Sequence, residues 1–342
     1  MGPGYEFLPA PLWLITVLHI LTLTLHFVAM NLLLGGVIII LFGKFENRWN
    51  NEVVKKFVHL FPSAMAATVT LGVAPLLFLQ LTYHKQVYAA AIISGWWWLG
   101  IIIMAIIAYY FFYAAAFGKT QKRMGLYLTL ALVALLYISY MYSSIFSMAE
   151  HPAMMKQLYA THQSGWMINP SLGDYILRWL HMVLGAVTVG GFFVGMIGNK
   201  NDRAYQVGKM VYLWGMVTAM VVGLAYLLSL TDILLPFMKT PAVWFLLVAI
   251  ILSAGSLHFY FKKQFWPAGT MLFVSMLCMV TIRHFVRRLF LEGIWEPAGM
   301  AIRPQWGVFV IFLVCFVAAI GALWYMLRLY FVDRAGRSAA TV

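Results

Sequence analysis

The chain has 342 residues, of which 63% are hydrophobic and 10% are charged, and its mean hydropathy is +0.88. Soluble domains contain about half apolar and about a quarter charged residues, so this composition excludes a soluble globular domain. The net charge is +13, but a nucleic-acid partner would need a soluble basic face, and we expect none. The sequence predicts an all-α, polytopic membrane helix bundle that forms a single membrane domain over residues 1–342.

The spanning helices follow from the apolar segments, taken in chain order. A span needs about 20 predominantly apolar residues. Nine segments satisfy this requirement, at 11–43, 57–82, 91–117, 123–147, 174–199, 205–230, 239–261, 264–291 and 304–332. Residues 1–10 lack the basic start and cleavage site of a secretory signal, so the first segment is expected to span.

Two links between these segments are informative. The longest, 148–173, carries Met, His, Trp and Tyr and few charges, so we expect it to lie on the bundle. The link at 231–238 is very short. With the N-terminus outside, the inner links hold about two thirds of the 23 Lys and Arg residues, which is the positive-inside pattern. We expect the N-terminus outside and the C-terminus in the cytoplasm of a multi-pass protein of a bacterial or archaeal cytoplasmic (inner) membrane.

Histidines are the most informative polar residues. The predicted topology places seven of the nine toward the outer face: His19, His26, His84, His151, His162, His181 and His284. All ten carboxylates fall in loops or at helix ends. Imidazoles without acid partners in a bilayer suit metal ligation better than proton transfer, because buried ionisable groups are costly and usually functional. The alternative is a set of ordinary polar side chains hydrogen-bonded across helix contacts.

Cysteine usage limits the kind of cofactor. Cys278 and Cys315 form neither a CxxC nor a CxxCH motif, which disfavours an iron–sulfur cluster and covalently attached c-type haem. The remaining haem type is non-covalent haem b, which side chains would hold by ligating its iron. His19 and His26 are seven residues apart and share one helix face about 10 Å apart, so each would need a ligand partner from another helix.

Further candidate ligands lie near the predicted outer face. His181 is followed by Gly185, Gly190 and Gly191, which leave room either for a flat macrocycle or for close helix packing. Met238 begins the predicted seventh helix, and a thioether is a normal sixth ligand of low-spin haem.

His284 is surrounded by Arg283, Arg287 and Arg288. These arginines would pair either with haem propionates or with lipid phosphates. The roles of His84, His151 and His162 stay open between haem ligands, quinone contacts and solvated side chains.

Three stretches resemble the large subunit (subunit I) of cytochrome bd quinol oxidase. They are LHFVAMNLLLGG around His26, LGVAPLLFLQ at 71–80 and RWLHMVLGAVTVGGFFVGM around His181. Nine helices with the N-terminus outside also match that family. The resemblance implies that His26 ligates haem at the family's oxygen-reducing site, and that His181 and Met238 ligate a low-spin haem b.

The chain also departs from that family. The family's long quinol-binding loop between helices six and seven is reduced to 231–238, and IRPQW at 302–306 is a poor match to its arginine-glutamine-proline-tryptophan motif. The third predicted helix, 91–117, has no carboxylate. Arg288 aligns with the family's glutamate ligand, and His284, one turn earlier, would take over that ligation. Oxygen reduction needs protons at a buried site, and carboxylates are their usual relay.

The sequence therefore predicts a haem b-binding subunit with two or three haems. It would exchange electrons between the quinone pool and an extracytoplasmic acceptor or donor such as a c-type cytochrome, within a complex of other redox subunits and membrane lipid. His181 with Met238 would ligate one haem, and His26 and His284 would ligate others, with His19 as a candidate partner. The alternatives are a shortened bd-type terminal oxidase and a non-redox membrane transporter or assembly factor.

Overall fold

The computed structural model describes residues 7–48, 51–118 and 121–339, which form the all-helical bundle expected from the composition. Nine helices in these ranges are long and apolar enough to cross a membrane, so by helix length and hydropathy the chain is a multi-pass membrane protein. They are α1 (Leu12–Phe42), α2 (Glu52–Thr82), α4 (Gly95–Phe117), α5 (Met124–Met148), α7 (Ile176–Ile197), α8 (Asp202–Ser229), α10 (Ala242–Phe261), α11 (Phe265–Phe290) and α12 (Trp306–Ala339).

The chain divides into two compact units. One takes the residues up to Ile15 and those from Ala298 onward. In it, β1 (Phe7–Leu8) pairs in parallel with β2 (Ala301–Ile302), and α12 follows. The other unit, Thr16–Pro297, holds most of α1 and the remaining helices, including all the histidines.

Within the larger unit, the pairs α4–α5, α7–α8 and α10–α11 pack as sequence neighbours. Lipid is as apolar as the helix surfaces, so helices in a membrane associate through close packing of small residues. Gly35 of α1 and Gly190 of α7 form such a contact, where a Cβ on Gly190 would lie 2.5 Å from the Gly35 carbonyl carbon. This crossing fixes α1, with its two histidines, against α7, which carries His181.

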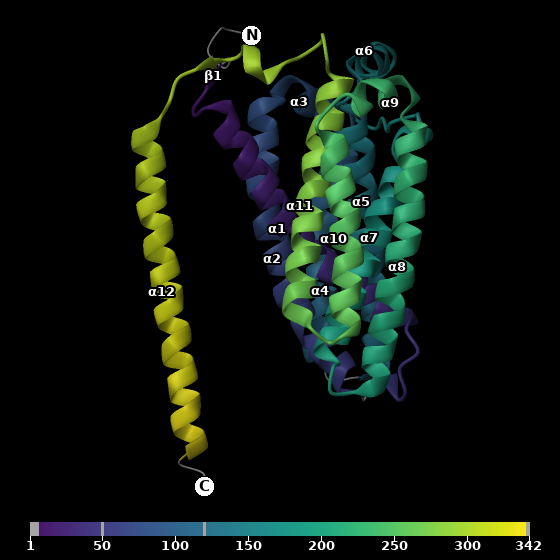
Figure 1. Cartoon of the computed structure of the whole chain (residues 1–342). Helices are drawn as coiled ribbons and strands as arrows, with labels where there is room; N and C mark the ends of the chain where they lie inside the picture. Colours follow the sequence, from purple (N-terminus) through teal and green to yellow (C-terminus); the bar gives the residue numbers. More distant parts are fainter. Residues whose placement is uncertain (1–6, 49–50, 119–120, 340–342) are drawn as a thin grey trace. The chain divides into compact units, whose positions relative to one another are not determined.

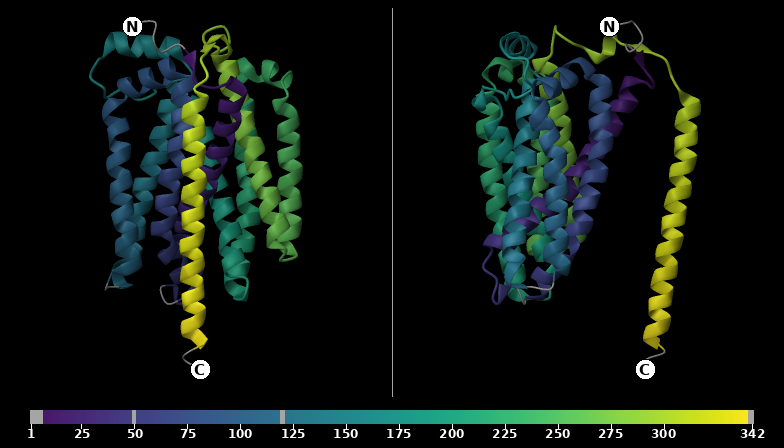
Figure 2. Two further views of the ribbon diagram at one scale, coloured as in Figure 1. Left: turned by 90° about the vertical axis from the view of Figure 1, so that its left-hand side faces the viewer. Right: turned by 180° about the vertical axis from the view of Figure 1, so that it is seen from behind.

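Three short helices lie together at one end of this unit: α3 (His84–Ile93), α6 (Pro152–Thr161) and α9 (Thr231–Met238) (Figures 1 and 2). We call this the capped end; the predicted topology makes it the outer face. Trp97 Nε1 donates to the Trp166 carbonyl at 2.9 Å, and Ser94 Oγ donates to the Met167 carbonyl at 2.8 Å. The prediction that the link 148–173 lies on the bundle is confirmed.

Several helix ends differ from the prediction. α2 begins at Glu52 rather than 57 because the Asn51 side chain accepts a hydrogen bond from Val53 N at 3.0 Å, which caps the helix. The predicted helix 91–117 begins at Gly95, after a break at Ser94 that ends α3.

The prediction that Met238 begins the seventh spanning helix is wrong. The short link at 231–238 is itself helical, Met238 ends α9, and α10 begins at Ala242. A segment of eight residues is too short to show a clear helical period, and Pro236 inside it argues against a helix, so the sequence carries no clear helix signal here.

Candidate cofactor site and a buried charge cluster

His26 lies near the middle of the membrane bundle, as the fifteenth of the 31 residues of α1. Its Nδ1 is 2.9 Å from the carbonyl oxygen of Thr68 on α2. The imidazole rests on Gly72 of the same helix, where a Cβ would come within 2.9 Å of the ring. Because Gly72 has no side chain, the ring can reach the carbonyl one turn before it.

His181 is held in the same way by a different pair of helices. Its Nδ1 is 2.8 Å from the carbonyl oxygen of Ala219 on α8, and its ring rests on Gly223, where a Cβ would come within 2.7 Å. The spacing between carbonyl and glycine is four residues in both cases. The chain thus builds one local arrangement twice, around His26 and around His181.

These hydrogen bonds orient the second ring nitrogen. A carbonyl oxygen can only accept, so Nδ1 donates, and in the neutral imidazole the lone pair then belongs to Nε2. His19 does the same, with Nδ1 3.1 Å from the carbonyl oxygen of Pro75. Among the described residues, no hydrogen-bond partner meets Nε2 of His19, His26 or His181. A ring fixed through Nδ1 with Nε2 free is the usual state of a metal-ligating histidine.

The glycines of α7 separate into two roles. A Cβ on Gly190 would meet the backbone of Gly35, and one on Gly191 would lie 2.7 Å from the backbone of α8, so both serve helix packing. Gly185 differs, since a Cβ there would meet nothing within 4 Å. Gly185 lies one turn beyond His181 and therefore on the same helix face, and the space next to Gly185 is open.

The other predicted ligands are placed less tightly. Met238 ends α9 with 56% of its surface exposed, whereas the residues that hold the His181 ring are on α8. His284 lies near the capped end of α11, within electrostatic reach of His19 and Arg287. The sequence predicts that the candidate ligands lie near one end of the bundle. His26 departs from this prediction because it lies near the middle of the bundle.

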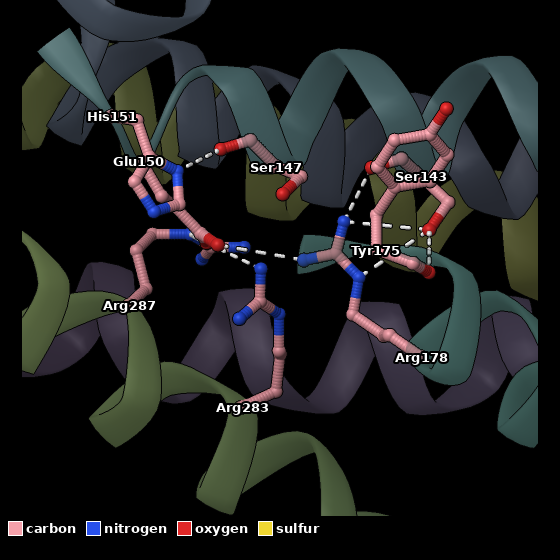
Figure 3. Close-up of polar contacts among 8 residues, drawn as sticks. All are labelled: Ser143, Ser147, Glu150, His151, Tyr175, Arg178, Arg283 and Arg287. Atoms are coloured by element: carbon pink, nitrogen blue, oxygen red, sulfur yellow. Dashed lines mark hydrogen bonds and ion pairs between the residues drawn. The ribbon is translucent and has the colours of Figure 1, made fainter. Parts of the chain in front are cut away.

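Glu150, Arg178, Arg283 and Arg287 form a buried charge cluster (Figure 3). It lies at the capped end, where α5 ends. The Glu150 side chain is only 3% exposed, and it follows the last turn of α5. Arg178 Nη1 of α7 is 3.4 Å from Oε2, Arg287 Nε of α11 is 3.3 Å from Oε1, and Arg283 Nη2 also pairs with Oε1. Burial by itself would raise the pKa of Glu150, but the charges of Arg283, Arg178 and Arg287 outweigh it and hold the pKa below its ordinary value.

The three arginines differ in how many partners they have. Arg178 donates to both the backbone and the hydroxyl of Ser143 besides Glu150. Arg283 Nη1 is buried without a hydrogen-bond partner among the described residues. Arg287 lies over the Tyr83 ring, 5.7 Å from its centroid. Of the arginines around His284, Arg283 and Arg287 belong to the cluster, whereas Arg288 is exposed.

The sequence did not identify Glu150 as the partner of the arginines, because an acidic residue in a link between helices is normally expected to be exposed to solvent. The usable signal was Arg178. An arginine inside an apolar helix is costly unless it is paired, and the link 148–173 that precedes its helix contains Glu150. Pairing these two residues would have predicted the centre of the cluster.

Two of the remaining capped-end histidines make local contacts. His151 Nδ1 donates to the Ser147 carbonyl at 2.9 Å and its ring contacts Phe290, while His84 meets Trp295 edge-on. No three His, Cys, Asp or Glu side chains gather around a possible metal ion in the described ranges. Haem iron takes only one or two axial ligands from the protein, so single oriented imidazoles fit haem rather than a bare metal ion.

Comparisons with protein-family models, with curated proteins and with solved structures each found no match to this chain.

Proposed function

We propose that this chain is a haem b-binding membrane subunit that transfers electrons between the quinone pool and an extracytoplasmic partner such as a c-type cytochrome. The observation that carries the proposal is the set of intramembrane imidazoles fixed through Nδ1 with Nε2 unpartnered, at His19, His26 and His181. The open space at Gly185, one turn beyond His181, supports room for a macrocycle. When bound, haem supplies one-electron transfer.

In this proposal the protein supplies ligands, orientation and a dry environment. The carbonyls of Thr68 and Ala219 hold His26 and His181, so that Nε2 is presented without rotation of the ring. His284, with His19 near it, provides a further ligand position, which makes two or three haems. Met238 stays the proposed sixth ligand of the His181 haem, although its exposed position on α9 gives it no support from neighbouring side chains.

The distribution of acids favours electron transfer over oxygen reduction. Among the described residues, Glu150 is the one buried carboxylate. Three arginines lower its pKa and keep it ionised, which makes it a poor proton carrier. Quinol that is oxidised near the outer face needs no proton path through the bilayer, so an electron conduit is compatible with this chain, whereas a buried oxygen site lacks its usual relay.

Absorption spectroscopy of the purified chain, combined with His181→Ala, tests this function. We expect a Soret band and a b-type α band in the reduced-minus-oxidised spectrum, and His181→Ala should remove one b-type component. His59→Ala is the matched control, because His59 is exposed near the other end of α2, and it should leave the spectrum intact.

The other outcomes identify the alternatives. Absence of both bands would exclude a haem protein and favour a transporter or assembly factor. A chlorin-type red band with quinol-dependent oxygen uptake would favour a shortened oxidase. An unchanged spectrum in His181→Ala would refute the ligand assignment.

A further inference from the structure

The buried charge cluster carries more positive than negative charge. Three guanidinium groups meet one carboxylate, which leaves a net charge of 3 − 1 = +2. The side chains of Arg178, Arg283 and Arg287 are only 8%, 20% and 10% exposed. Taking uncompensated charge out of water costs several kcal/mol per ion even after relaxation. A second source of negative charge would offset this cost.

The unused hydrogen-bond donors indicate where that charge would lie. Arg178 directs Nε and both Nη groups to Ser143 and Glu150. Arg283 keeps Nη1 buried and without a partner among the described residues. Arg287 reaches Glu150 through Nε alone, so its Nη groups have no hydrogen-bond partner in that part of the chain. Arg283 and Arg287 are one helical turn apart on α11 and therefore neighbours. The free donors point to a ligand that carries carboxylate or phosphate oxygens.

His284 lies beside this pair of donors. It is three residues before Arg287, which places both on adjacent parts of one helix face, and it is within electrostatic reach of Arg287 and His19. An anion held by Arg283 and Arg287 would therefore be close to a proposed ligand of haem iron. Haem b carries two propionates, whose combined charge matches the excess of the cluster.

We propose that Arg283 and Arg287 bind the propionates of the haem at His284, and that Glu150 sets the charge of the cluster to match them. This inference rests on the proposed function. The propionates share their chemistry with phosphate, so the test includes inorganic phosphate as a competing probe. Glu150 lowers the positive charge of the cluster, which would be +3 without it.

Reconstitution with two haems tests the propionate contact. The haem-depleted full chain is titrated with haem b and with its dimethyl ester, which has the same ring and iron but no propionate charge. A charged hydrogen bond contributes about 1.5–3 kcal/mol, or roughly ten- to a hundredfold in affinity. We expect wild-type protein to prefer haem b by at least about tenfold at the His284-dependent site. Arg283→Gln and Arg287→Gln should remove this preference, and the exposed neighbour variant Arg288→Gln should keep it.

Midpoint potentials provide a readout that a purely structural role would not produce. Positive charge near haem favours the reduced iron, so Glu150→Gln should raise the potential of the His284-dependent haem and Arg283→Gln should lower it. Arg283→Lys keeps the charge in a smaller side chain and should restore both the potential and the preference for haem b. It also keeps the test valid if the glutamine variant folds poorly.

The outcomes separate this inference from the proposed function. Equal affinity of wild-type protein for haem b and its ester would overturn the inference while the haem function stands. Uptake of neither haem would overturn both. Inorganic phosphate that competes with haem b but not with the ester would support a shared anion site. Phosphate that binds the haem-loaded chain and is lost in Arg283→Gln would show that the arginines serve a free anion, which would overturn the propionate assignment.

Discussion

A methyl group added at Gly223 tests whether the His181 ring is held in place for ligand binding. The Cβ of Gly223→Ala would lie 2.7 Å from the imidazole, so the ring must turn away from the Ala219 carbonyl and Nε2 must move with it. Loss of such a supporting contact typically reduces metal affinity by about 10- to 100-fold. We expect Gly223→Ala to weaken haem binding at His181 to this extent and to shift its α band, measured by haem titration.

The control for this substitution lies away from the proposed haem. Gly173→Ala adds a methyl group where nothing lies within 4 Å, so it should leave both the affinity and the spectrum unchanged. Equal behaviour of the two variants would mean that the ring is not held through α8. It would also remove the main support for His181 as a ligand.

Glu150 predicts a pH dependence of stability with a definite sign. Its pKa is lower in the folded chain than its ordinary value of 4.5. Its contribution is therefore complete above about pH 4.5 and is lost as the pH falls through the folded pKa. Breaking a buried ion pair costs about 3–5 kcal/mol, so Glu150→Gln should lower the Tm in detergent at neutral pH. The gap in Tm between wild type and variant should close as the solution becomes more acidic.

An exposed acid provides the comparison for Glu150. Glu46 pairs with Arg203, but their side chains are 71% and 57% exposed, and such surface pairs contribute little. Glu46→Gln should leave the Tm nearly unchanged at every pH. A gap between wild type and Glu150→Gln that stays constant down to strongly acidic pH would contradict the assignment of Glu150 as an ionised group in the folded state.

At the scale of elements, the crossing of α1 and α7 determines where two proposed haem ligands lie. A Cβ on Gly35 would overlap the carbonyl oxygen of Ala186, so Gly35→Ala must push the helices apart. Overpacking costs about 1–3 kcal/mol. We expect a lower Tm together with a changed spectrum of the His26 haem, because His26 is two and a half turns away on the same helix. Gly173→Ala, in open surroundings, should change neither; an equal loss in both variants would argue against this crossing.

The helices differ in how far the sequence could predict them. The nine long ones follow from the length of their apolar segments, a signal that needs no tertiary information. The three short ones do not, because eight to ten residues give too few turns for a clear period. Ends set by a single cap, such as Asn51, or by a tertiary hydrogen bond, such as that of Ser94 to Met167, were missed for the same reason.

The candidate site shows a similar limit. Histidine is rare in membrane helices, so His26 and His181 could be singled out by type and position. Their hydrogen-bond partners could not be predicted, because the acceptors are the backbone carbonyls of Thr68 and Ala219. Every residue has a carbonyl, so the sequence does not mark these two. The glycines at 72 and 223 gain meaning only once two helices are known to be neighbours. Glu150 was missed because its partners lie on α7 and α11, which approach it only in the folded bundle.

At the scale of the whole molecule, the charge distribution predicts which compartment the proposed partner occupies. The positive-inside rule predicts that the capped end lies outside. This end holds the charge cluster, and His181 and His284 lie near it, so electrons that leave the chain there would reach an extracytoplasmic acceptor.

Cysteine labelling tests this orientation. In a chain whose Cys278 and Cys315 are replaced by serine, Gly173→Cys places a thiol in an exposed position at the capped end, and Lys262→Cys places one in an exposed position at the opposite end. A membrane-impermeant maleimide added to intact cells should label the first variant at once and the second only after lysis. The reverse pattern would put the capped end in the cytoplasm. Because the proposed haem ligands at His181 and His284 would then lie near the inner face, the electron partner would have to be cytoplasmic and the c-type cytochrome would no longer be its natural candidate.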